Sequence, residues 1–193
     1  MPALPPDCAL IVIDVQQAFD DACWGSRNNP AAEAHIGALI AAWRRSGRPV
    51  VHIQHRSRRP DSLFHPHAPG FQVKPEALPL AGESVMYKEV NSAFIGTDLE
   101  RHLRGAGIGT LVIAGITTDH CVSTTTRMAA NLGFETYLVG DACATFERTG
   151  PDGRHYSADQ MHDSALASLH GEFATVLPCA RVLQRVAGMA GIV

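Results

Sequence analysis

The sequence carries little charge, and neither sign dominates. Only 18% of its 193 residues are Asp, Glu, Lys or Arg, below the ~25% typical of soluble domains. Its 16 basic side chains stand against 19 acidic ones, a formal net charge of −3 with neutral histidine. Nucleic-acid binding is therefore disfavoured, because a phosphate backbone attracts an excess of Lys and Arg. With 46% hydrophobic residues, the composition argues against disorder and predicts a homo-oligomer, a dimer or tetramer.

Long hydrophobic runs are also missing. No stretch approaches the ~18 apolar residues that are needed to span a bilayer. The first ten residues, MPALPPDCAL, lack the basic-then-apolar order of a signal peptide. We therefore predict a cytoplasmic protein that does not bind membranes. Because no linker or low-complexity tract divides the chain, we expect a single domain over residues 1–193.

Several local motifs of catalysis and cofactor binding are absent. The five cysteines are widely spaced and contain no C-x-x-C pair, which fits neither a disulfide framework nor a zinc ribbon. The chain has no phosphate loop of the G-x-x-x-x-G-K-[ST] type and no G-x-S-x-G elbow. The glycine-rich segment Gly105–Gly109 precedes a predicted strand, whereas a dinucleotide fingerprint follows one. We interpret this segment as the end of a helix and expect no cofactor.

Histidine pairs at short spacing raise the question of a metal. His52 and His55, and then His65 and His67, have the close spacing that is common among zinc ligands. However, residues 50–57 contain no carboxylate, and three arginines at positions 56, 58 and 59 would oppose a cation. We therefore predict histidines that form hydrogen bonds, and no metal site.

Short apolar segments alternate with helical patterns along the chain. Strands are predicted at Ala9–Ile13, Pro49–Ile53, Ser84–Tyr87, Thr110–Ala114, Glu135–Val139 and Phe173–Leu177. Helices are predicted at Ala31–Ser46, Gly96–Arg104 and Asp159–His170, each followed by a glycine. This alternation predicts an α/β fold: a doubly wound, six-stranded, mostly parallel sheet with helices on both faces and strand order 3-2-1-4-5-6. Irregular segments at 56–82 and 141–156 are expected at the carboxyl edge, where ligands bind.

Three reactive side chains stand where predicted strands end. Asp14 follows the first strand, Lys88 follows the third, and Cys121 lies in the turn after the fourth. Because the carboxyl ends of parallel strands share one edge, we expect the three to lie close together. Each residue alone also has a plainer interpretation: Asp14 as a cap, Lys88 as a solvated cation and Cys121 as a small buried hydrophobe.

The position of Cys121 distinguishes it from the other cysteines. If Thr118 caps the next helix, Cys121 occupies the third helical position, where free backbone N–H groups and the helix dipole favour a thiolate. The β-branched residues that follow, Val122 and Thr124–Thr126, are weak helix formers. This departure from local rules at a strand-to-helix turn is typical of a functional site.

Three motifs occur in order at these strand ends: Asp14–Gln16 (DVQ), Lys88 followed by Asn91–Phe94 (NSAF), and Gly115–Thr125 (GITTDHCVSTT). Together they resemble the isochorismatase-like cysteine hydrolases, the superfamily of nicotinamidase and of carbamoylsarcosine and ureidoacrylate amidohydrolases. The resemblance covers residues from about 9 to 177.

The resemblance implies a catalytic triad of Asp14, Lys88 and Cys121. Asp14 would take the thiol proton, Lys88 would stabilise the thiolate, and Cys121 would attack a carbonyl carbon. It further implies a cis peptide between Ile116 and Thr117, with the backbone N–H groups of Thr117 and Cys121 forming an oxyanion hole.

One difference from the superfamily makes nicotinamide a less favoured substrate. Nicotinamidases of this superfamily carry an Asp-x-His metal motif, whereas His52–Ser57 (HIQHRS) has no Asp. We therefore predict a cysteine-dependent hydrolase of a small non-peptide amide or carbamoyl compound. A vinyl-ether hydrolase of the isochorismatase kind and a non-catalytic small-molecule binder remain the alternatives. Phe19, Trp24 and Ile116 are candidate walls of the substrate pocket, although each could equally pack in the core. His155 and Tyr156 could reach its mouth.

Overall fold

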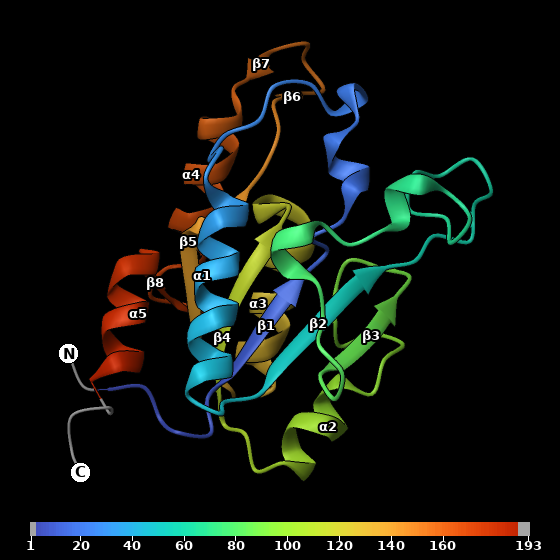
Figure 1. The fold of residues 1–193 in the computed structure, drawn as a ribbon. Helices are drawn as coiled ribbons and strands as arrows, with labels where there is room; N and C mark the ends of the chain where they lie inside the picture. The colour runs from blue at the N-terminus through green and yellow to red at the C-terminus, as the bar shows by residue number, and fades with distance from the viewer. Residues whose placement is uncertain (1–2, 189–193) are drawn as a thin grey trace.

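The computed structural model describes residues 3–188, and its centre is a sheet of six parallel strands (Figure 1). The strand order is β3-β2-β1-β4-β5-β8. The bounds are β1 Ala9–Ile13, β2 Val50–His55, β3 Ser84–Lys88, β4 Thr110–Ile116, β5 Glu135–Ala144 and β8 Thr175–Leu177. Because β8 is the sixth strand of this sheet along the chain, the predicted order 3-2-1-4-5-6 is confirmed.

Helices cover both faces of the sheet. Strand β1 is buried along its whole length, and its alternate residues enter two separate cores. Leu10 and Val12 pack in a core with α1 and α5, whereas Ile11 and Ile13 pack in a core with α2, α3 and α4. Burial of each such side chain stabilises the fold by roughly 1.5–3 kcal/mol. The helices are α1 Ala32–Arg45, α2 Leu99–Gly105, α3 Ser123–Asn131, α4 Ala158–Leu169 and α5 Cys179–Ala187.

Strand β5 and the segment after it differ from the sequence-based expectation. Strand β5 continues to Ala144, so the predicted loop from Asp141 begins four residues too early. The register shifts at this point: Ile113 of β4 pairs with Leu138, and Gly115 pairs with Cys143, so the extra residues of the irregularity lie in β5. The remaining loop contains a small antiparallel hairpin of β6 (Arg148–Thr149) and β7 (His155–Tyr156).

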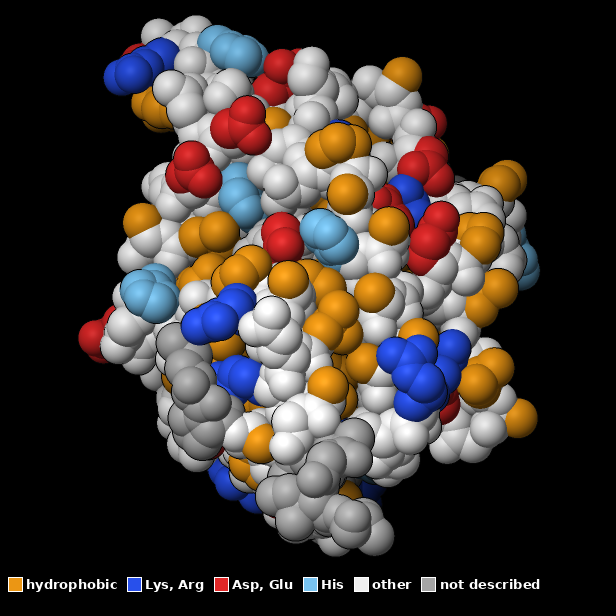
Figure 2. Space-filling model, turned by 60° about the vertical axis from the view of Figure 1, so that its left-hand side comes forward, with side chains coloured by type: hydrophobic (Ala, Val, Ile, Leu, Met, Phe, Trp, Pro, Cys, Tyr) orange, Lys and Arg blue, Asp and Glu red, His pale blue; other side chains and the backbone are white. Residues whose placement is uncertain are grey.

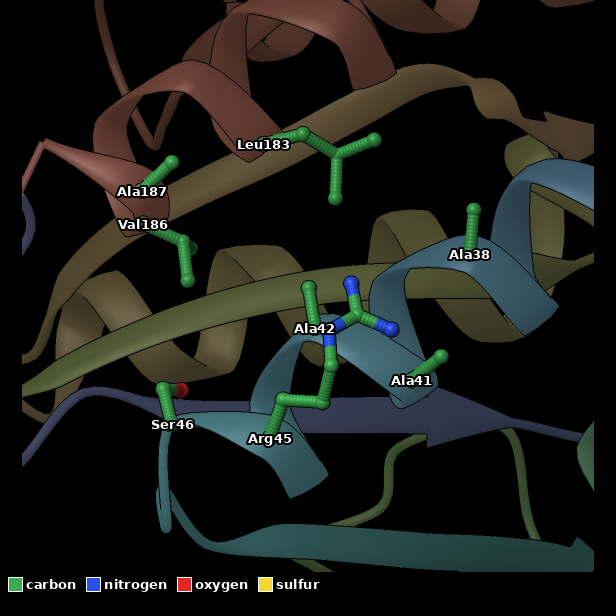
Figure 3. Close-up of a pocket in the computed structure, with 8 residues that line it drawn as sticks. All are labelled: Ala38, Ala41, Ala42, Arg45, Ser46, Leu183, Val186 and Ala187. Carbon is green, nitrogen blue, oxygen red and sulfur yellow. The ribbon is translucent and has the colours of Figure 1, made fainter. Parts of the chain in front are cut away.

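An apolar groove between α1 and α5 lies away from the carboxyl edge of the sheet (Figure 3). Its volume is about 530 Å³. Because Ser46 at one wall lies just before β2 begins, the groove belongs to the edge where strands start. Figure 2 shows hydrophobic side chains gathered on this side of the molecule. The homo-oligomer stays a prediction, which light scattering of the native protein would check. The lining residues are Ala38, Ala41, Ala42, Arg45, Ser46, Leu183, Val186 and Ala187.

Among the described helices, none has the length and apolar character needed to cross a bilayer. The longest, α1, has 14 residues, which span ~21 Å at the rise of an α-helix.

Candidate active site

The structure brings Asp14, Lys88 and Cys121 together at the carboxyl edge of the sheet. Asp14 follows β1, Lys88 is the last residue of β3, and Cys121 lies after β4. The Lys88 ammonium reaches past β2, so that Nζ lies 2.6 Å from Asp14 Oδ2 and 3.2 Å from Cys121 Sγ. The side chains of Lys88 and Asp14 are 0% and 1% exposed. An ion pair this deeply buried touches the thiol directly.

Asp14 occupies an unusual backbone conformation. Its φ of 52° lies in the left-handed region, which costs a non-glycine residue of order 1–3 kcal/mol. The backbone holds it there through a hydrogen bond from Asp14 N to Ile53 O (2.8 Å) and one from Gln16 N to Asp14 O (2.8 Å). Within residues 3–188, Asp14 Oδ1 is buried and has no hydrogen-bond partner. The carboxylate therefore keeps one oxygen available to accept a proton.

A glycine makes the approach to Cys121 possible. Gly115 has a φ of 144°, and a Cβ atom there would lie 2.1 Å from Ile13 O on the neighbouring strand. Only glycine fits this contact. The following peptide bond, between Ile116 and Thr117, is cis.

The turn Thr118–Val122, here called the nucleophile turn after the role that the resemblance implies for Cys121, differs in one respect from the expected helix start. It is a π-helical turn with Thr117 at the N-cap position, so Cys121 is its fourth residue and not the third of a helix capped by Thr118. The Thr118 hydroxyl instead lies 2.8 Å from Nδ1 of the buried His162 on α4. This contact fixes the start of the turn to the helix behind it.

The chemistry of the resting thiol also differs from the expectation. Burial raises the pKa of Cys121 to about 12, the charge of Asp14 adds to the increase, and Lys88 opposes it. The position of Cys121 at a predicted helix start favoured a thiolate, and this prediction was wrong. Burial of Sγ raises the pKa more than the start of the turn lowers it, and the sequence does not reveal that burial. The neutral thiol is therefore the favoured form of Cys121 at neutral pH.

His55, the last residue of β2, is a fourth member of this cluster. Its Nδ1 lies 3.2 Å from Lys88 Nζ. Burial lowers the pKa of His55, and the positive charge of Lys88 lowers it further. A neutral imidazole is thus an acceptor for the ammonium and helps to orient it. The sequence marked His55 only as a possible metal ligand, although its place at the end of β2, between β1 and β3, could have indicated this role.

Aromatic rings lie beside the cluster. Phe19, Trp24, Phe64 and Phe146 have ring centroids 5.0–6.2 Å apart, and Ile116 packs with them. The ring of Phe64 also lies 5.3 Å from that of His55. Phe19, Trp24 and Ile116, the predicted pocket walls, therefore pack together, and Phe64 connects them with His55. Phe64 and Phe146 belong to loops whose course the sequence does not reveal.

Comparison with known proteins agrees with these features. Residues 8–180 match the family model of the isochorismatase domain. The chain belongs to the isochorismatase family. It is 52% identical over 169 residues to the isochorismatase family protein YrdC of Bacillus subtilis (strain 168), covering 88% of this chain and 90% of that protein. It is 31% identical over 183 residues to a streptothricin hydrolase of Streptomyces noursei, covering 93% of this chain and 65% of that protein. A solved structure of an isochorismatase-family protein from Chromobacterium violaceum superposes with a TM-score of 0.95 at 45% identity, covering 97% of each chain.

The resemblance to isochorismatase-like cysteine hydrolases is thereby confirmed, and the chain is an isochorismatase-family hydrolase. The Asp-x-His metal motif of nicotinamidases is absent here, and the residues around Cys121 do not fit a metal ion. Ligand atoms of Asp14, His55 and Cys121 do lie within 4.8 Å of one another. The carboxylate comes from Asp14, directly after β1, and not from residues 50–57. The Lys88 ammonium contacts all three. A metal ion there would meet this positive charge.

The other histidines that were considered as ligands lie elsewhere. The buried His52 is 2.9 Å from Glu83, and burial lowers its pKa. The rings of His65 and His67 lie 5.2 Å apart on the loop after β2.

We expect chelators to leave the activity of this isochorismatase-family protein unchanged, because an ammonium occupies the centre of the only described cluster of metal-ligating side chains within residues 3–188. Hydrolysis would be measured before and after dialysis against EDTA and 1,10-phenanthroline. Stoichiometric zinc by elemental analysis, together with inactivation on its removal, would contradict the expectation.

Proposed function

We propose that the protein hydrolyses the C–N bond of small, non-peptide amides or carbamoyl compounds, with Cys121 as the nucleophile. The observation that carries this proposal is the buried contact of the Cys121 thiol with an ammonium that is itself paired with a carboxylate. A thiol, a base and a cation within contact distance are the parts that nucleophilic catalysis through cysteine requires.

In the first half-reaction, Cys121 Sγ attacks the carbonyl carbon while its proton passes to Asp14. A base is needed because the thiol pKa is raised to about 12. The backbone N–H groups of Thr117 and Cys121 stabilise the oxyanion of the tetrahedral intermediate. When the C–N bond breaks, Asp14 returns the proton to the nitrogen, so that an amine or ammonia leaves and a thioester remains.

In the second half-reaction, water attacks the thioester and Asp14 takes its proton. The C–S bond then breaks, and the proton passes from Asp14 to the departing sulfur, which regenerates the thiol. The products are a carboxylic or carbamic acid and the free enzyme. Lys88 stabilises negative charge on sulfur whenever it develops, since Nζ lies 3.2 Å from Sγ.

The aromatic cluster beside the triad provides the substrate pocket in this proposal. Phe19, Trp24 and Ile116 form its walls, and Phe64 and Phe146 complete it. These side chains carry no charge, so they favour a small substrate with an apolar or flat acyl group. The relationship to a streptothricin hydrolase supports hydrolytic chemistry on this fold.

The decisive experiment is a panel of small amides, ureas and carbamoyl compounds that is screened for released ammonia or amine. Turnover of at least one C–N compound, lost on alkylation of Cys121, would support the proposal. Alkylation is best done in a Cys23→Ser background, because Cys23 is exposed and reacts without bearing on the site. Release of an enol product from vinyl ethers alone would favour the vinyl-ether hydrolase, and binding without turnover would favour a small-molecule binder.

Lys88→Met should reduce kcat/KM by ~10² to 10⁴-fold, as expected when charge stabilisation of a nucleophile is lost. Because Lys88 opposes the increase in the Cys121 pKa, its loss should raise that pKa further. Alkylation of Cys121 at pH 9 should consequently become slower. Both rates would be measured with circular dichroism as a check on folding. Normal turnover by a folded Lys88→Met variant would remove Lys88 from the mechanism.

A further inference from the structure

A second cavity, here called the hairpin cavity, lies against the nucleophile turn but is not lined by the triad. Its volume is about 610 Å³. The walls come from the nucleophile turn, the β6–β7 hairpin and α4, at the end of the molecule where the hairpin projects past the sheet (Figure 1). None of the aromatic residues beside the triad lines it, whereas Tyr156 of β7 does. The hairpin cavity is therefore separate from the proposed substrate pocket.

The hairpin cavity carries one uncompensated positive charge. Arg148 lines it, but its Nε lies 3.4 Å from Oδ2 of Asp119, whose carboxylate also accepts a hydrogen bond from the Thr145 hydroxyl. Burial acts to raise the pKa of Asp119, but that hydrogen bond and the charges of His120 and Arg148 bring it below the usual range. Arg148 and Asp119 thus neutralise each other. Among the residues that the structure describes, the Arg154 guanidinium forms no ion pair and lies over the Tyr156 ring, whereas the backbone N–H of Arg154 donates to Asp152 Oδ1 at 3.0 Å.

Arg154 is also placed against a flat apolar surface. Its guanidinium Cζ lies 5.1 Å from the centroid of the Tyr156 ring, and the Met161 side chain lines the same cavity. A tyrosine ring and a thioether favour contact with another ring. The side chains of Gln160 and Ser164, also in the wall, offer hydrogen bonds to polar substituents.

We propose that the hairpin cavity binds a small aromatic monocarboxylate. The planar carboxylate matches the two-pronged hydrogen bonding of the Arg154 guanidinium, and a single negative charge matches the single uncompensated positive one. The ring of the ligand packs against Tyr156 and Met161. This site does not depend on the proposed function, because no atom of the triad takes part in it.

The occupant also touches the catalytic turn. Asp119 and His120 line the cavity and are the second and third residues of the nucleophile turn, directly before Cys121. A ligand in the hairpin cavity therefore contacts the backbone segment that carries the thiol, while Cys121 itself is not part of the cavity wall.

The test uses 4-fluorobenzoate as a probe in a ¹⁹F NMR titration of the full-length protein. We expect saturable binding to the native protein and to Cys121→Ala alike. Arg154→Ala should weaken binding at least tenfold, which corresponds to about 1.4 kcal/mol. The uncharged 4-fluorobenzamide should bind at least tenfold more weakly than the carboxylate. Arg154 is exposed, so its replacement leaves the core untouched.

Arg101→Ala is the matched control. Arg101 is an exposed arginine on α2 that pairs with Asp98, and its loss should leave the affinity unchanged. Three results would overturn the proposal: no saturable binding, equal affinity for Arg154→Ala, or loss of binding when Cys121 is alkylated, which would place the probe at the triad. Displacement of the probe by equimolar inorganic phosphate would show that the cavity binds anions in general, and it would overturn the proposal that the ligand is aromatic.

Discussion

Replacement of Cys121 by alanine is expected to lower turnover by roughly 10⁴- to 10⁶-fold, since the loss of a covalent nucleophile has effects of this size. The substitution removes the only atom that forms the thioester in the proposed mechanism. What remains is the buried Lys88–Asp14 ion pair, which can still polarise water but has no sulfur beside it. Release of ammonia or amine from a substrate identified in the panel would measure the effect.

The fold of Cys121→Ala should stay intact. Cys121 is buried at 9% exposure in a core with residues of β1 and α3, and removal of one sulfur atom costs of the order of 1 kcal/mol. Urea denaturation would measure this cost. Cys8→Ala is the matched control, because Cys8 is a fully buried cysteine that lies before β1, at the opposite edge of the sheet. Cys8→Ala should lose comparable stability and keep its activity.

Near-normal turnover by a folded Cys121→Ala variant would mean that water attacks the substrate directly. The vinyl-ether alternative would then account better for the site, because that reaction does not require a covalent nucleophile. Loss of activity together with loss of the native denaturation transition would indicate a structural role, and Cys121→Ser would then be the variant to compare.

The positions of the three triad residues could be predicted because the fold itself determines them. Parallel strands that alternate with helices bring every strand end to one edge, so Asp14, Lys88 and Cys121 were expected to converge before any side-chain geometry was known. The apolar patterns of β1 and β4 were clear because both strands are buried on both faces. Helix α5 was missed, although Val182 and Val186 pack it against the core of α1.

The electrostatics of the site could not be predicted in the same way. A pKa depends on how much water reaches an atom, and the burial of Cys121 comes from residues that are distant in the sequence. The role of His55 depends on a 3.2 Å contact with a side chain 33 residues away. Likewise, Phe64 reaches the triad only through the course of the long loop after β2. Local spacing contains none of this information.

Asp14→Asn is expected to separate the reactivity of Cys121 from catalysis. An asparagine cannot take the thiol proton, so turnover should fall by ~10² to 10⁴-fold. The negative charge of Asp14 is also one cause of the raised Cys121 pKa, after burial, while Lys88 acts in the opposite direction. Removal of that charge leaves the ammonium to stabilise the thiolate, and the pKa should fall. Alkylation of Cys121 at pH 8 should therefore become faster in the same variant that loses turnover.

The alkylation and turnover rates of Asp14→Asn are compared with those of a surface variant. Asp98→Asn removes an exposed carboxylate beside α2 and should change neither rate. An Asp14→Asn variant that is slow in both alkylation and turnover would mean that Asp14 has a structural role, since a folded site without the carboxylate charge has a more acidic thiol.

The acyl-enzyme links these expectations to the mechanism. Rapid acid quenching of the native enzyme during turnover should reveal a mass increase equal to the acyl fragment, on the peptide that contains Cys121. In the proposed mechanism Asp14 activates water against the thioester. Hydroxylamine is a nucleophile that needs no base, so it should release any acyl group that accumulates on Cys121 in Asp14→Asn. If Asp14→Asn forms no acyl group and hydroxylamine intercepts none, the carboxylate is needed already in the first half-reaction. If the native enzyme also shows unmodified Cys121 under steady turnover and hydroxylamine captures no acyl group from it, no thioester accumulates, and direct attack by water becomes the better mechanism.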